Sequence, residues 1–201
     1  MFNTIPSDEI IEKTAVALKA NGIETFVVAT GEEAKQKLLD MLPEKAAVMN
    51  MTSVTMDTIG VTDAILNSGK YQPARTKLMD EKTESREKRA LGATSDWATG
   101  SVHAVTQDGK LIIASYTGSQ LPAEAYGSPH VVFIAGAQKI VTDLGEGMKR
   151  IYEYVLPLES ERANKAYNMT SGSFVSKVLI INSELNPDRI KIILVKEILG
   201  F

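Results

Sequence analysis

Two loops rich in hydroxyl and glycine residues carry the side chains best suited to ligand chemistry in this sequence. Ser53-Val54-Thr55 follows the apolar run Ala46–Asn50, and Thr117-Gly118-Ser119-Gln120 follows the run Leu111–Ser115. Each loop is predicted to lead from a strand into a helix, where free backbone N–H groups and the helix dipole favour anions. The alternative is that these residues are only helix caps and turn formers. Because two such loops lie at strand ends in one domain, a ligand site and simple capping are equally supported.

Two further features could join these loops. Gly100-Ser101 is another turn of small residues, a weak signal by itself. Lys139 follows the apolar run Val131–Ala135 and could place a cation at the same rim, where an anionic group would be its natural partner. The alternative is an ordinary surface lysine near a helix start.

The two histidines are weaker candidates. His103 lies in an alternating run and His130 directly precedes a strand, and neither has a partner at metal-ligand spacing. A structural role is expected more often than acid–base catalysis. Asp96-Trp97 could place a carboxylate at a pocket mouth, but a core tryptophan beside a capping aspartate is the stronger interpretation.

The elements that would position these residues alternate along the N-terminal part of the chain. Ser7 is expected to cap a helix that Asn21-Gly22 ends. The predicted elements that follow are a strand at Thr25–Ala29, a helix at Glu32–Leu42, a strand at Ala46–Asn50 and a helix at Met56–Leu66. Strand, helix and strand with short joints are typical of a parallel sheet.

The C-terminal part is predicted to contain a hairpin and further strands. Gln107-Asp108-Gly109 separates two β-rich runs, which is a hairpin signal. A helix is expected over Val141–Val155, with Pro157 after its end, and strands over Lys177–Ile181 and Ile190–Val195. The charged stretch Thr76–Arg89 is expected to be a solvated helix face, the alternative being a basic patch that meets a partner. No repeat or linker divides residues 1–201, so one domain is expected.

Composition excludes several classes of function. The net charge is −3, with both signs interspersed, which disfavours a nucleic-acid binder. There is no cysteine, so these residues hold no disulfide, no thiolate nucleophile and no iron–sulfur cluster through thiolates. The sequence lacks GxGxxG after the first strand, GxxxxGK[ST] and GxSxG. No apolar run is long enough for a membrane span, and a cytoplasmic protein is expected.

The run from Thr99 to Arg162 resembles the core of the LUD domain of lactate-utilisation protein C and its relatives. The motifs that carry this resemblance are Gly100-Ser101-Val102-His103-Ala104-Val105, Gly118-Ser119-Gln120-Leu121-Pro122, the segment Val132–Asp143 and Val155-Leu156-Pro157-Leu158-Glu159. Asn50–Gly60 resembles the family's Ser-x-Thr loop, and residues 186–195 resemble its closing strand region. The resemblance covers most of the chain and is most specific in its middle third.

The resemblance implies the fold of ribose-phosphate isomerase, glucosamine-phosphate isomerase and CoA transferases. That fold is a three-layer α/β/α arrangement with a mostly parallel central sheet, to which this chain adds a β-hairpin. Ser/Thr/Gly loops at its strand ends hold phosphate, sugar or CoA-like ligands. The resemblance therefore implies ligand binding by Ser53, Thr55, Thr117, Gly118, Ser119, Gln120 and Lys139, and the turn of small residues adds Gly100 and Ser101 as candidates.

The sequence departs from the family pattern in one place and lacks two catalytic features of the superfamily. Many LUD relatives carry an acidic residue before the Thr-Gly pair, where this chain has Ala98. The glutamate nucleophile of CoA transferases and the acidic cluster of ribose-phosphate isomerases have no clear counterpart. An isomerase or transferase function would rest on the fold alone.

Three functions remain open at this level. The leading one is a non-redox component of L-lactate utilisation that binds a small anionic metabolite or iron–sulfur partner proteins. The second is a stand-alone enzyme acting on a phosphorylated or CoA-linked metabolite, favoured if a carboxylate lies near Ser53 and Ser119. The third is an assembly protein with a vestigial pocket. We expect no cofactor and no metal site, and the sequence is compatible with a homo-oligomer.

Overall fold

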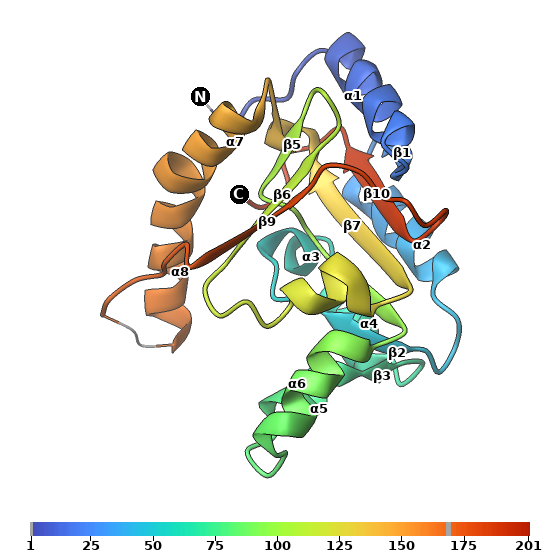
Figure 1. The fold of residues 1–201 in the computed structure, drawn as a ribbon, viewed down its shortest axis with the longest axis vertical. Helices are drawn as coiled ribbons and strands as arrows, with labels where there is room; N and C mark the ends of the chain where they lie inside the picture. The colour runs from blue at the N-terminus through green and yellow to red at the C-terminus, as the bar shows by residue number, and fades with distance from the viewer. Residues whose placement is uncertain (1, 168–169) are drawn as a thin grey trace.

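The computed structural model describes residues 2–167 and 170–201, and a six-stranded parallel sheet forms its centre (Figure 1). Its strand order is β1-β10-β7-β4-β2-β3, and every neighbouring pair is parallel. The strands are β1 (Glu24–Val28), β2 (Ala47–Asn50), β3 (Gln72–Pro73), β4 (Trp97–Gly100), β7 (His130–Gly136) and β10 (Ile190–Val195). The expected α/β fold with a mostly parallel central sheet is confirmed.

Helices α2 (Gly31–Met41), α3 (Val54–Thr58) and α4 (Val61–Asn67) cover one face of this sheet. Leu38, Met56 and Ile65 from these helices share one hydrophobic cluster with Ile134 of β7 and Val195 of β10. The sheet residues of this cluster alternate with those that face the other way, because successive side chains of a strand point to opposite faces. The continuous apolar runs of β7 and β10 therefore contribute side chains to two hydrophobic cores, one on each face of the sheet.

The other face of the sheet is covered by α1 (Asp8–Ala20) and by a second sheet of order β8-β5-β6-β9. Its strands are β5 (Ala104–Thr106), β6 (Leu111–Ser115), β8 (Ile140–Val141) and β9 (Lys177–Ile181). Leu18, Val105 and Ile113 join Phe133 and Leu194 in one cluster, so both sheets share a core. A four-stranded sheet was not expected from the sequence.

The predicted hairpin is present as the antiparallel pair β5–β6. Gly109 in its turn has φ +85°, and a Cβ there would lie 2.6 Å from the backbone of Ala17 in α1. Only glycine allows this backbone conformation and this close approach without strain. The turn therefore fixes the second sheet against α1.

A long helical run packs on the outer side of the second sheet. It consists of α7 (Leu144–Arg150), the π-turn η3 (Ile151–Val155) and α8 (Leu156–Tyr167). Asp143 caps it by accepting a hydrogen bond from the Glu146 N–H at 3.0 Å. Figure 1 shows this run along the left edge of the molecule and the pair α5 (Ala74–Met79) and α6 (Ser85–Thr94) at its bottom.

Three predicted helix boundaries are wrong. The helix expected from Val141 begins at Leu144, because Ile140–Val141 pairs with β5 as the strand β8. The helix expected over Met56–Leu66 is divided into α3 and α4, because Gly60 adopts φ +71° and interrupts the helical backbone. The helix expected to end before Pro157 instead continues through it. In η3 the Leu156 N–H bonds to the Ile151 carbonyl, an i→i+5 pattern that shifts the register directly before the proline.

The remaining short elements connect these layers. They are the π-turn η1 (Ala123–Gly127) and the 3₁₀ turn η2 (Ala137–Lys139). Within the described residues, no helix combines the length and hydrophobicity that crossing a bilayer requires.

Candidate functional site

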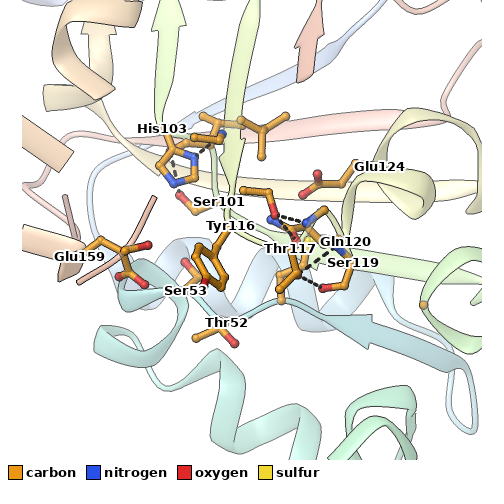
Figure 2. Close-up of a pocket in the computed structure, with 18 of the residues that line it drawn as sticks. Thr52, Ser53, Ser101, His103, Tyr116, Thr117, Ser119, Gln120, Glu124 and Glu159 are labelled. Atoms are coloured by element: carbon orange, nitrogen blue, oxygen red, sulfur yellow. Dashed lines mark hydrogen bonds between the residues drawn. The ribbon is translucent and has the colours of Figure 1, made fainter. Parts of the chain in front are cut away.

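A cavity of about 1290 Å³ opens between α5 and α6 on one side and the η3–α8 run on the other. Figure 2 shows side chains from the loop after β2 and from the loop after β6 pointing into it. Eight of the nine predicted ligand residues line it: Ser53, Thr55, Ser101, Thr117, Gly118, Ser119, Gln120 and Lys139. The chain therefore gathers these predicted residues around one space.

Gly100 does not line the cavity. A Cβ at this position would lie 2.6 Å from the Met51 sulfur, so the glycine permits β4 to pack against a residue that does line it. Its observed contribution is close packing behind the cavity wall.

Lys139 connects three predicted segments at the buried end of the site. Its Nζ donates to the Thr55 and Ser101 hydroxyls at 3.0 Å each and to the Val102 carbonyl at 3.1 Å. The residue is only 2% exposed, so it is not the surface lysine that the sequence left open. Burial, together with the Arg150 guanidinium, lowers the pKa of Lys139 to about 7.

Arg150 is a second buried cation beside Lys139. Its Nη1 donates to the His103 carbonyl at 2.5 Å, whereas Nε and Nη2 have no hydrogen-bond partner. Burial lowers the pKa of Arg150 to about 10. Within residues 2–167 and 170–201, neither Lys139 nor Arg150 forms an ion pair. Lys139 lines the cavity and Arg150 lies behind the lining, and the absence of a carboxylate partner for either cation makes this end of the site electropositive.

The two loops use part of their polar groups internally, as the capping interpretation anticipates. The Ser53 hydroxyl caps α3 by accepting from the Met56 N–H at 3.4 Å. The Thr117 hydroxyl bonds to that of Ser119 at 3.1 Å, and the Ser115 hydroxyl donates to the Gln120 side-chain oxygen at 3.0 Å. These bonds hold the loops in shape around the cavity.

The second loop differs from expectation in its surroundings. It follows β6, which belongs to the four-stranded sheet and not to the central one. The element after Pro122 is the five-residue π-turn η1 and not a regular helix. A helix dipole therefore contributes little to anion binding at this loop, which offers polar side chains to the cavity instead.

Sequence reasoning missed two buried polar groups of the cavity lining. The Glu124 carboxyl is fully buried, and neither of its oxygens has a hydrogen-bond partner. The Asn50 side chain is 3% exposed, and neither polar atom of its amide has a partner. Figure 2 shows the Glu124 carboxyl directed into the cavity. Burial raises the pKa of Glu124 to about 8. Because buried polar groups are nearly always hydrogen-bonded, both side chains are suited to meeting a polar ligand group.

Three cations on α5 and α6 also line the cavity: Arg75, Lys88 and Arg89. None of them has an ion-pair partner in the described residues. They lie at the edges of the charged stretch that was expected to be a solvated helix face, with a basic patch as the alternative. The sequence showed these positive charges, but their location at the cavity depends on the packing of α6 against the Ser119 loop.

His103 lines the cavity as a neutral, oriented side chain. Its Nδ1 accepts a hydrogen bond from the Ala114 N–H at 3.1 Å, which places the ring proton on Nε2. Burial, Lys139 and Arg150 lower its pKa to about 3. An imidazole with a pKa of about 3 is neutral at pH 7 and is a weak base, so the structural interpretation is favoured.

The other aromatic and acidic candidates lie away from the cavity. His130 stacks on Trp97 with ring centroids 4.4 Å apart, and Trp97 belongs to the core beneath α2–α4. Asp96 is exposed, outside the cavity lining, and accepts from the His130 N–H through its carbonyl. Among the residues that the structure describes, no group of three or more His, Asp or Glu side chains is arranged to hold a metal ion.

Comparison with known proteins identifies the family. The sequence profile of the LUD domain matches residues 11–195. The chain belongs to the LUD domain family. Within this LUD domain, the position before Thr99-Gly100 is Ala98, which is fully buried in the core shared by the two sheets.

The LUD fold is also found in a solved structure. The crystal structure of a DUF162 family protein from Deinococcus radiodurans superposes with a TM-score of 0.57 at 13% sequence identity, covering 94% of this chain and 99% of that chain. This similarity shows a shared fold.

Two other structures are similar over a smaller part. Ribose 5-phosphate isomerase from Plasmodium falciparum gives a TM-score of 0.34 at 18% identity, covering 66% of each chain. The eIF2B beta structure from Chaetomium thermophilum gives 0.31 at 13% identity, covering 69% of this chain and 44% of that one. No curated protein matches the sequence.

Proposed function

We propose that the cavity binds a small anionic metabolite and that the chain acts, through this binding, as a non-redox component of L-lactate utilisation. The observation that carries the proposal is the Lys139 ammonium, buried at the cavity beside Arg150 and without an ion-pair partner in the described residues. A carboxylate or phosphate would supply the missing counter-charge. Arg75, Lys88 and Arg89 would attract the anion at the mouth.

The lactate role rests on the resemblance to lactate-utilisation proteins and not on the geometry of the cavity. Relatives of that type act with iron–sulfur partner proteins, which would carry the electrons because this chain has no cysteine. The proposal places the chain in the cytoplasm as a single domain. Adding the chain to such partner proteins is expected to increase their conversion of lactate to pyruvate, and an unchanged rate would contradict this part.

Anion binding is tested by thermal denaturation and calorimetric titration with L-lactate, pyruvate, phosphate and pyrophosphate. A ligand at about 100 times its dissociation constant should stabilise the fold by about 2.7 kcal/mol. Arg89→Gln should weaken binding, whereas Arg86→Gln, an exposed position on the same helix outside the cavity lining, should not.

Lys139→Met should abolish the binding if the variant folds. If Lys139→Met does not fold, the comparison of Arg89→Gln with Arg86→Gln still tests the proposal. An absence of binding across the panel, or equal effects of the two arginine substitutions, would overturn the proposal.

A stand-alone enzyme is the second candidate, and Glu124 is the observation that favours it. Its carboxyl lines the same cavity as Ser53 and Ser119, and its raised pKa together with the lowered pKa of Lys139 brings both groups into the range of proton transfer near neutral pH. Glu124→Gln keeps the shape and hydrogen-bonding capacity but cannot release a proton. An enzyme would retain ligand affinity and lose turnover in this variant, whereas a binding protein would be unaffected.

The assembly protein with a vestigial pocket is supported least. An assembly protein with a vestigial pocket should have the pocket filled by its own side chains. The cavity instead has a volume of about 1290 Å³ and a lining that includes many polar side chains.

A further inference from the structure

The size of the cavity bears on the kind of anion it holds. Ligand pockets typically enclose about 300–1,000 Å³. The volume of about 1290 Å³ exceeds this range, so a three-carbon acid would occupy only a small part of it. A ligand that uses the whole cavity must extend from the buried Lys139 to the mouth.

Two half-exposed aromatic rings stand at the mouth of the cavity. Tyr116 and Phe174 both line the cavity and are 48% and 52% exposed. Their rings stack on one another with centroids 6.0 Å apart and an interplanar angle of 28°. Figure 2 shows Tyr116 projecting into the open space between Ser53 and Glu159. Half-exposed rings in such a stack offer a planar surface on which another ring can lie.

The aromatic pair shares the cavity with the basic rim. Tyr116 directly precedes the Thr117–Gln120 loop, and this loop contacts α6 near Gly92. Lys88 and Arg89 lie one turn earlier on α6, and Arg75 lies on the adjacent α5. The same mouth thus combines a planar apolar surface with three cations that have no ion-pair partner in the described residues.

From this combination we infer that the ligand is a phosphorylated compound with a planar aromatic ring, the chemical class of nucleotides. The phosphates would lie on the cations of the cavity, and the ring would stack on the surface formed by Tyr116 and Phe174. This inference rests on the proposed anion site and narrows its ligand class. Stacking of this kind is sequence-tolerant for bases because every base has a π-face, so the structure selects no particular ring.

The test compares phosphates with and without a ring in calorimetric titrations of the full chain. ADP, GDP and FMN are the ring-bearing probes, and pyrophosphate and adenosine supply the phosphate and the ring alone. At least one ring-bearing probe should bind roughly fivefold or more tightly than pyrophosphate, since stacking contributes that much per base.

Substitutions then locate the ring. Phe174→Ala should bring the affinity of that probe down to the affinity of pyrophosphate and leave pyrophosphate itself unchanged. Tyr126→Ala is the control, because Tyr126 is 85% exposed and outside the cavity lining. It should change neither affinity.

The outcomes separate the two proposals. If all three ring-bearing probes bind no more tightly than pyrophosphate, or if Phe174→Ala has no effect, the ring inference is overturned while the anion site stands. If neither pyrophosphate nor any nucleotide binds, the ring inference fails, and the anion site fails with it only if L-lactate, pyruvate and phosphate do not bind either. Binding of adenosine as tight as that of ADP would overturn the anion site instead.

Discussion

The charge state of Lys139 should couple anion binding to pH. Its pKa is about 7 in the folded protein, so the ammonium form predominates below that value and the neutral amine above it. An anion stabilises the ammonium form, and binding above pH 7 must therefore take up a proton. We predict that affinity for L-lactate or sulfate, whose own charges are constant in this range, falls by up to about tenfold per pH unit above 7.

Calorimetric titration at pH 6 and 8.5, in buffers of different ionisation enthalpy, measures both the affinity and the proton uptake. The same titrations on Glu124→Gln provide the reference, because Glu124 also lines the cavity and its pKa of about 8 lies in the same range. A pH-independent affinity for the wild-type chain would exclude Lys139 from the binding site.

Glu124 should make the folded state less stable as pH rises. Burial raises its pKa from 4.5 to about 8, so the folded protein holds a proton there that the unfolded chain has already lost. The stabilisation is complete below pH 4.5 and is lost as pH rises to about 8. We predict that Glu124→Gln removes this loss, worth roughly 1–4 kcal/mol between pH 5 and 8. Urea denaturation of both proteins at the two pH values gives the difference, and parallel pH profiles would refute the prediction.

At the scale of elements, the π-turn η1 holds Glu124 in place by packing tightly on α6. A Cβ at Gly127 would lie 1.7 Å from the Ala93 carbonyl oxygen, which is backbone and cannot move aside cheaply. Arg189 supports the same turn by donating to the carbonyls of Ala123 and Glu124 at 3.3 and 3.0 Å. The position of the carboxyl thus depends on contacts between elements far apart in the chain.

We predict that Gly127→Ala destabilises the fold by about 1–3 kcal/mol, the usual cost of overpacking. Tyr126→Ala in the same turn should stay within about 0.5 kcal/mol of the wild type, because that side chain is exposed. Equal midpoints of chemical denaturation for the two variants would show that the turn can move away from α6.

At the scale of the whole molecule, the two sheets are expected to unfold together. Val105 and Ile113 of the second sheet share a core with Phe133 and Leu194 of the central sheet, so neither sheet keeps its core without the other. We predict a single calorimetric transition whose calorimetric and van't Hoff enthalpies agree. Two separated transitions would show that residues 1–201 form more than one folding unit.

The sequence by itself determined the features that depend on near neighbours along the chain. The alternating runs around Asp108-Gly109 predicted the hairpin, and the apolar runs before Ser53 and after His130 predicted strands of the central sheet. The sequence also singled out Lys139 and the hydroxyl loops, because their residue types and their positions after strands are local properties. The hairpin and strand predictions are confirmed because a turn or a short strand depends on only a few adjacent residues, whereas ligand binding by Lys139 and the loops stays a prediction.

Only the tertiary structure decided what those residues meet. Lys139 bonds to Thr55, 84 residues away, and to Ser101, 38 residues away, because parallel crossovers bring distant segments to one place. The strand Trp97–Gly100 lacks a strong β pattern and forms through its neighbours β2 and β7. Packing and register likewise decide three other features. These are the burial of Glu124, the position of Arg75, Lys88 and Arg89 at the cavity, and the continuation of a helix through Pro157. Such long-range contacts are set by the fold as a whole, and no local pattern encodes them.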